Sequence, residues 1–223
     1  MSLPESLWAD ARATAEGAAV GAGAFAAGLA ATFLLQRDAL GDSQRVADGV
    51  STAVGPALAD ALGDVADWLE PDVLEVVAWF YYAAHGVTLD VTAGALGRSA
   101  HWTADLRQTP LWDGQLALVP PLALLAAGGF LAWRHRDREP GAATSGVRVA
   151  LGYAAAAAVV ATAATYTRDA GFATVTLRPP LVAAVAYCAA YALAFGALGA
   201  FLASGLGDGG GGESATGPGR PRQ

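Results

Sequence analysis

Residues 181–206 read LVAAVAYCAAYALAFGALGAFLASGL and contain no charged side chain. At a rise of ~1.5 Å per residue, a helix of this length reaches across the ~30 Å hydrocarbon core of a bilayer. Pro179 and Pro180 stand directly before the run, where they disfavour helix further upstream. The stretch therefore predicts a membrane-spanning helix with a sharp start.

Four other apolar stretches have a similar character: residues 17–35, 73–95, 116–133 and 147–166. Over the whole chain of 223 residues, 54% are hydrophobic and 15% are charged. Ordinary soluble domains carry about a quarter charged residues. We therefore predict an all-α fold, a polytopic transmembrane helical bundle of about five spans within residues 1–206. It would lie in the cell membrane, with the lipid bilayer as its first partner.

Two of the predicted spans contain residues that shape or pack helices. Gly17 and Gly21 lie four positions apart on one face of the first span, where a second helix can approach closely. Pro120 and Pro121 lie inside the third span and remove backbone hydrogen bonds. We expect helix packing at the two glycines, in a dimer or within the chain. At the two prolines we expect either a kink or a later helix start.

The connection between the first two spans, residues 36–72, is acidic. Apolar residues recur in it every three or four positions, and Gly55-Pro56 interrupts the pattern. We predict an amphipathic extramembrane helix pair that packs on protein, because its acidic face would repel anionic headgroups. Residues 207–223 are rich in Gly, Ser and Pro and predict a disordered tail.

The distribution of arginines predicts an orientation. The most basic stretch, Arg134 to Arg138, follows the third span, and basic residues beside spans favour the cytoplasmic side. With five spans, this rule places the N-terminus outside and the C-terminus in the cytoplasm. Residues 1–12 lack the basic start of a signal peptide, so we expect the first apolar segment to remain in the protein.

The second predicted span contains the densest run of large side chains, which ends at His85. On a helix, Tyr81 and Tyr82 lie one turn before His85, while Glu75 and Asp90 flank the span. Ionisable groups inside membranes are costly and face the bundle interior. His85 is either a proton-responsive or solute-contacting group, or a neutral histidine whose hydrogen bonds fix the packing. The two acids either line a cation path or mark the water boundary.

The residue types that are missing exclude several chemistries. The chain has no Lys, so it forms no Schiff base with retinal or pyridoxal phosphate. Its single cysteine, Cys188, cannot make an internal disulfide or a cysteine-ligated cluster. One intramembrane histidine cannot hold a bis-histidine haem, and no HExxH run occurs. We predict no enzyme activity, no cofactor and no metal, and the net charge of -7 argues against a nucleic-acid partner.

Five stretches carry a family resemblance: Gly17–Leu29, Val77–His85, Leu118–Leu122, Val149–Tyr153 and Phe195–Phe201. The most specific of them is VAWFYYAAH at 77–85. On these residues the chain resembles a family of uncharacterised multi-span membrane proteins, a domain of unknown function from extreme halophiles. The resemblance implies a shared membrane fold and brings no assigned activity.

Two functions fit these observations. The first is a non-enzymatic membrane component or accessory subunit, with a second copy or another membrane protein as its partner. Its support is the small Ala- and Gly-rich bundle, which offers packing faces and little chemistry. The alternative is a small-solute or ion transporter or channel, proton-linked through His85. Its support is the proline break together with His85 and the flanking acids.

Overall fold

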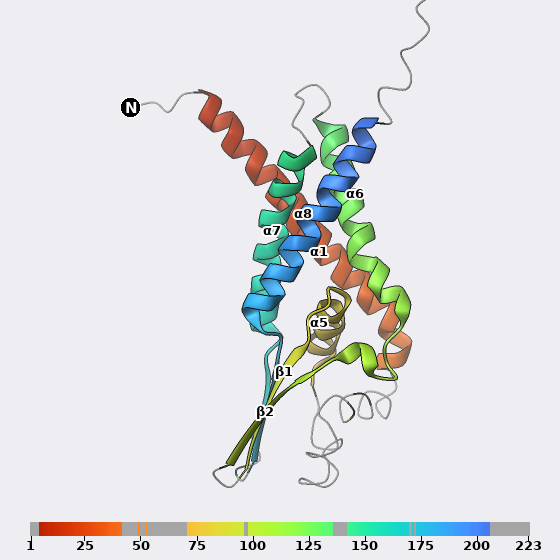
Figure 1. Ribbon diagram of the computed structural model, residues 1–223, viewed down its shortest axis with the longest axis vertical. Helices are drawn as coiled ribbons and strands as arrows, with labels where there is room; N and C mark the ends of the chain where they lie inside the picture. Colours follow the sequence, from red (N-terminus) through yellow and green to blue (C-terminus); the bar gives the residue numbers. More distant parts are fainter. Residues whose placement is uncertain are drawn as a thin grey trace, which may run out of the picture.

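Four long helices dominate the computed structural model (Figure 1), which describes residues 5–41, 49, 52, 71–95, 98–135, 142–169, 171 and 173–205. Each is long and apolar enough to cross a membrane, which suggests a membrane protein. In the case of α6, this length includes the 3-10 turns of η2 (Gly114–Leu118) that precede it. The four helices are α1 (Glu5–Leu40), α6 (Val119–Arg134), α7 (Ala142–Ala163) and α8 (Leu181–Gly205).

The predicted second span is wrong. Residues 73–95 form the helix α5 (Val73–Ala84) and the strand β1 (Leu89–Ala95). With 12 residues, α5 is ~18 Å long and cannot cross a core of ~30 Å. The chain turns back just after it because Gly86 takes a φ of 83°, a left-handed conformation that costs glycine little. The described part of the chain therefore has four candidate spans rather than five.

The prediction of an all-α fold is confirmed only in part. The described residues are mostly helical, but four strands form an antiparallel sheet in the order β2-β1-β4-β3. The other strands are β2 (Arg98–Ala104), β3 (Tyr166–Asp169) and β4 (Ala173–Arg178). In β1 and β4, buried apolar residues alternate with more exposed ones, which is the period of a half-buried strand. The buried set is Leu89, Val91, Ala93, Ala173, Val175 and Leu177.

The sheet extends away from one end of the helical bundle and is joined to it by short connections (Figure 1). Residues 164–165 separate α7 from β3, and Pro179 and Pro180 separate β4 from α8. On the other side, β2 continues through η1 (Leu106–Gln108) and η2 into α6. Short connections leave few rotatable bonds, so the sheet has a defined orientation relative to the bundle.

The ends of the helices favour the later helix start over the kink at the two prolines, and they correct the predicted placement of the termini. Pro120 and Pro121 lie in the first turn of α6, where backbone N–H groups have no helical partner, so they begin the helix and do not kink it. The start of α1 and the end of α8 lie at the same end of the bundle (Figure 1). The predicted placement of the termini on opposite sides therefore does not fit four spans. Most of the predicted helix pair in 36–72, and the tail 207–223, lie outside the described residues.

Close contacts at glycines hold α1 against α7. A Cβ on Gly21 would stand 2.0 Å from the carbonyl oxygen of Val149, and a Cβ on Gly152 would stand 1.7 Å from that of Ala18. Gly17 faces α7 in the same way. The structure thus places both predicted packing glycines against a helix of their own chain. Two further glycines make the corresponding contact between α6 and α8: a Cβ on Gly128 would meet the carbonyl of Gly196, and a Cβ on Gly199 would meet the carbonyl of Leu125.

Candidate functional site at the end of helix α5

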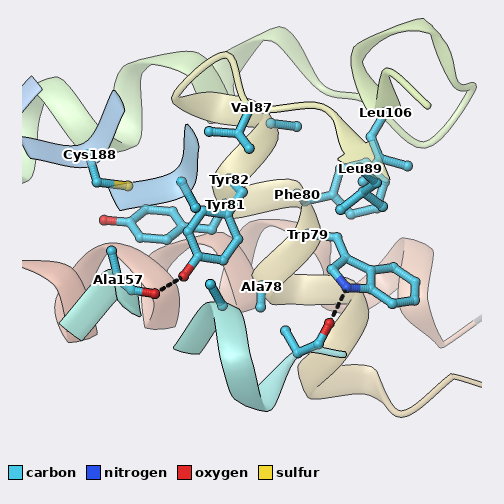
Figure 2. Close-up of a cluster of buried hydrophobic side chains, with 14 of the residues drawn as sticks. Ala78, Trp79, Phe80, Tyr81, Tyr82, Val87, Leu89, Leu106, Ala157 and Cys188 are labelled. Carbon is cyan, nitrogen blue, oxygen red and sulfur yellow. Dashed lines mark hydrogen bonds between the residues drawn. The ribbon is translucent and has the colours of Figure 1, made fainter. Parts of the chain in front are cut away.

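Helix α5 lies inside the bundle, at the end that carries the sheet, and hydrogen bonds attach it to α7. Its residues from Val76 to Ala84 are all buried. Trp79 donates from Nε1 to the carbonyl of Ala164 at 2.8 Å, and the Tyr82 hydroxyl donates to the carbonyl of Ala157 at 2.6 Å (Figure 2). These bonds engage the polar atom of each side chain and fix where α5 lies along α7.

His85, directly after α5, closes a ring of hydrogen bonds with Tyr81 and Tyr153. Its Nδ1 lies 2.8 Å from the backbone oxygen of Tyr81, and its Nε2 lies 2.8 Å from the Tyr153 hydroxyl. That hydroxyl lies 2.6 Å from the Tyr81 hydroxyl. A carbonyl oxygen only accepts, so Nδ1 of His85 carries the imidazole proton and Nε2 accepts a hydrogen bond. Tyr153 therefore donates to His85 and accepts from Tyr81, and each proton of the ring has one position.

Aromatic side chains from α1 and α8 enclose this ring. Phe25 of α1 packs edge-on against Tyr81 and Tyr153, with ring centroids 5.0 and 5.1 Å apart. Gly28 leaves room for the Tyr81 hydroxyl, which would stand 2.1 Å from a Cβ at that position. From α8, the Tyr191 ring lies 5.2 Å from that of His85. Three of the long helices thus meet at the end of α5.

The ring is electrically neutral at ordinary pH. His85 is 1% exposed, and burial lowers its pKa to about 4, with the hydrogen bond to the Tyr81 backbone opposing the shift. Burial also raises the pKa of the Tyr81 and Tyr82 hydroxyls. A neutral histidine with both nitrogens engaged stabilises packing, and it takes up a proton only if the ring opens.

Acid should therefore destabilise the protein. The His85 pKa is about 4 in the folded chain, against ~6.5 when unfolded. Between these values the unfolded chain binds a proton that the folded chain excludes. The stabilisation that neutral His85 contributes is then fully present above about pH 6.5, and it is lost as the pH falls toward the pKa of His85 in the folded chain. Between pH 7 and pH 5 we expect a loss of about 2 kcal/mol, seen as a falling Tm in detergent. His85→Gln, which cannot titrate, should flatten this profile; an unchanged profile in that variant would contradict the assignment.

The predicted acids do not join His85. Glu75 lies in the first turn of α5, at the opposite end from His85, and accepts from the backbone N–H of Asp72 at 3.0 Å. Asp90 lies on β1 in the sheet, 4.0 Å from His101 Nε2. Among the described residues, no three His, Cys, Asp or Glu side chains are grouped so that they could hold a metal ion. Of the predicted residues, the structure brings together His85 and Tyr81, with Tyr82 beside them on the same helix.

Tyr153 completes the ring, and sequence reasoning did not select it. It is the one aromatic residue within α7, in a stretch that is otherwise mostly alanine. A single aromatic side chain in such a helix is expected to fill a gap that alanine cannot fill. That isolation is the signal that could have identified it.

A family model described as a family of unknown function (DUF7978) matches residues 4–207. The chain belongs to this family. No curated protein and no solved structure matches it. The expected resemblance to an uncharacterised family is thus confirmed, while the halophilic origin stays a prediction. Because the match runs from the start of α1 to the end of α8, DUF7978 includes the sheet and the buried helix α5 as well as the four long helices.

Proposed function

We propose that this DUF7978 protein is a non-enzymatic membrane component, an accessory subunit whose four helices anchor a sheet that a protein partner recognises. The short connections between sheet and bundle carry this proposal. Residues 164–165 and Pro179–Pro180 leave the sheet little freedom to move against α7 and α8. The bond from Trp79 to Ala164 ties the same junction to α5. A partner bound to the sheet would therefore be held at a fixed orientation to the membrane.

The surface of the sheet also supports this proposal. A polar row crosses all four strands in register: His101, Thr92, Thr176 and Thr167. The hydroxyls of Thr167 and Thr176 lie 3.1 Å apart, and hydroxyls can both donate and accept hydrogen bonds. At the edge of the sheet, the first residues of β2, Arg98 to His101, are exposed. An exposed edge strand offers backbone groups to which a partner strand can bind.

Co-purification tests the proposal. We would extract the C-terminally tagged protein in mild detergent at high salt and identify stoichiometric companions. A partner should be lost from Thr92→Arg, in the middle of the sheet, and kept by Ser204→Arg, at the opposite end of α8. A partner retained equally by both variants would remove the sheet from recognition, and a clean homo-oligomer with no companion would contradict the accessory-subunit proposal.

The proposal includes an orientation of the protein in the membrane. Residues 135–141 form the short connection between α6 and α7 and include Arg136 and Arg138, which favours the cytoplasm for that end of the bundle. Both termini would then be cytoplasmic and the sheet external. A membrane-impermeant maleimide should label Thr92→Cys in intact cells and Ser204→Cys only after lysis. The native Cys188 is buried and stays unlabelled; the reverse pattern would invert the orientation.

A proton-linked transporter or channel acting through His85 is the second candidate. One observation favours it: α5 enters the bundle and the chain turns back at Gly86, and channels place non-helical backbone among their spans in this way. A pH-dependent solute flux into vesicles, lost in His85→Ala and kept in His101→Ala, would support this candidate. Flux that is indifferent to His85 would remove that residue from any mechanism.

A further inference from the structure

Arg107 lies on the outside of the bundle, next to the turn that follows α5. Its Nη1 is 4.0 Å from the position that a Cβ on Gly86 would take, and the Tyr187 ring of α8 is 3.9 Å from the same point. The Tyr187 and Tyr191 phenols also raise the pKa of the guanidinium, after the larger effect of its hydrogen bond to Asp105. The Arg107 guanidinium and the Tyr187 ring thus meet beside Gly86, and the Tyr191 phenol lies close enough to act on the charge of Arg107.

Asp105 binds one edge of this guanidinium. Its two oxygens accept from Nε and Nη2 of Arg107, both at 2.9 Å. The carboxylate fixes the direction of the side chain and leaves Nη1 on the Gly86 side. Within the described part of the chain, no hydrogen-bond acceptor is recorded for Nη1, and none for the hydroxyls of Tyr187 and Tyr191. The side chains of Arg107 and Tyr187 are about half exposed, at 44% and 50%. Arg107 and Tyr187 therefore face outward with donors to spare, next to the partly buried Tyr191.

The depth of the cluster along α8 places it near a membrane surface. With 25 residues, α8 is ~37 Å long, which exceeds the ~30 Å hydrocarbon core by several residues. Tyr187 lies six residues after Leu181, the first residue of α8. At ~1.5 Å per residue it lies about one turn inside the boundary on the side of the sheet. Side chains on a helix lean toward its N-terminus, which brings the Tyr187 hydroxyl toward that boundary, where Tyr side chains are enriched and where lipid phosphates lie.

We propose that Arg107, Tyr187 and Tyr191 bind the phosphate of a membrane lipid headgroup in the leaflet next to the sheet. The inference rests on the membrane placement in the proposed function, but not on the existence of a protein partner. Guanidinium groups bind phosphate oxygens through charge-assisted hydrogen bonds, and phenol hydroxyls add neutral ones. The acyl chains of such a lipid would run from Tyr187 toward the middle of α8, along exposed apolar side chains that include Leu193 and Leu198.

Native mass spectrometry of the full chain in detergent tests this site. The probes are phosphatidylglycerol, a neutral glycosyl diacylglycerol and inorganic phosphate. The unaltered protein should retain one phosphatidylglycerol in preference to the neutral lipid. Arg107→Gln should weaken this retention roughly tenfold, the order expected for a hydrogen bond to a charged group. Arg98→Gln, an exposed arginine on β2 in the sheet, should leave it unchanged.

Several results would overturn the proposal. Equal retention of the neutral lipid would show that phosphate is not recognised, and an equal loss in both arginine variants would show unspecific charge attraction. Displacement by millimolar inorganic phosphate would reassign the site to a soluble anion. If Arg107→Gln does not accumulate, Arg107→Lys and the double variant Tyr187→Phe, Tyr191→Phe take its place, each with reduced retention expected. Failure of these tests in a protein that inserts in the membrane removes the lipid site alone.

Discussion

Gly21→Ala should prevent the folded bundle from accumulating, whereas Gly23→Ala, two residues away on the same helix, should leave it intact. A Cβ at residue 21 would stand 2.0 Å from the carbonyl oxygen of Val149 and 3.0 Å from the backbone nitrogen of Tyr153. Backbone cannot rotate out of the way, so α1 and α7 must separate, at a cost of about 3 kcal/mol or more. A Cβ on Gly23 meets nothing within 4 Å.

Yield of monodisperse protein and Tm in mild detergent measure this difference. For Gly23→Ala we expect a change of less than about 1 kcal/mol, in the stabilising direction, because alanine favours helix over glycine. Gly152→Ala, on the other side of the same contact, should reproduce the loss. Equal Tm values for Gly21→Ala and Gly23→Ala would show that α1 and α7 do not meet at these glycines.

Tyr153→Phe should cost about 3 kcal/mol although it removes a single oxygen atom. The loss leaves the Tyr81 hydroxyl without its acceptor and His85 Nε2 without its donor, both in a buried site. A buried polar group without a partner costs about 1–3 kcal/mol. Tyr191→Phe is the matched control, because its ring also packs on His85 while no hydrogen bond is recorded for its hydroxyl in the described residues.

Thermal unfolding in detergent distinguishes the two tyrosines. Tyr153→Phe should lower the Tm clearly and Tyr191→Phe should change it little. The double variant Tyr81→Phe, Tyr153→Phe should cost less than the sum of its single changes, because the ring opens only once. Additive costs, or similar shifts for residues 153 and 191, would contradict a closed ring.

The long helices could be predicted because their signal is local. Residues 181–206 are continuously apolar after two prolines, and α8 begins at Leu181 as expected. Gly17 and Gly21 were selected because small residues four apart share a face of a helix. Their partner could not be selected, since contact with α7 joins residues more than a hundred positions apart.

The error at residues 73–95 has a physical origin. Hydropathy measures transfer out of water and does not distinguish lipid from protein as the new surroundings. The side chains from Val76 to Ala84 are buried in protein, by the long helices and by the segment that contains η1 and η2. They are therefore as apolar as a membrane span without being one. The alternation of apolar and polar residues in 89–95 and 173–178 is a strand pattern. Each run is short and lies next to a longer apolar helix, so the helical pattern dominated the prediction.

By itself, the sequence determined that several long apolar helices form, where α8 begins, and that chemistry requiring Lys or paired cysteines is absent. These follow from composition and from patterns within one turn of helix. Only the tertiary structure decided that α5 is a buried helix, that residue 90 pairs with residue 178, and that His85 meets Tyr153. Each of these depends on contacts between segments far apart in the chain, and such contacts are set by the packing of the whole bundle and not by local residue preference.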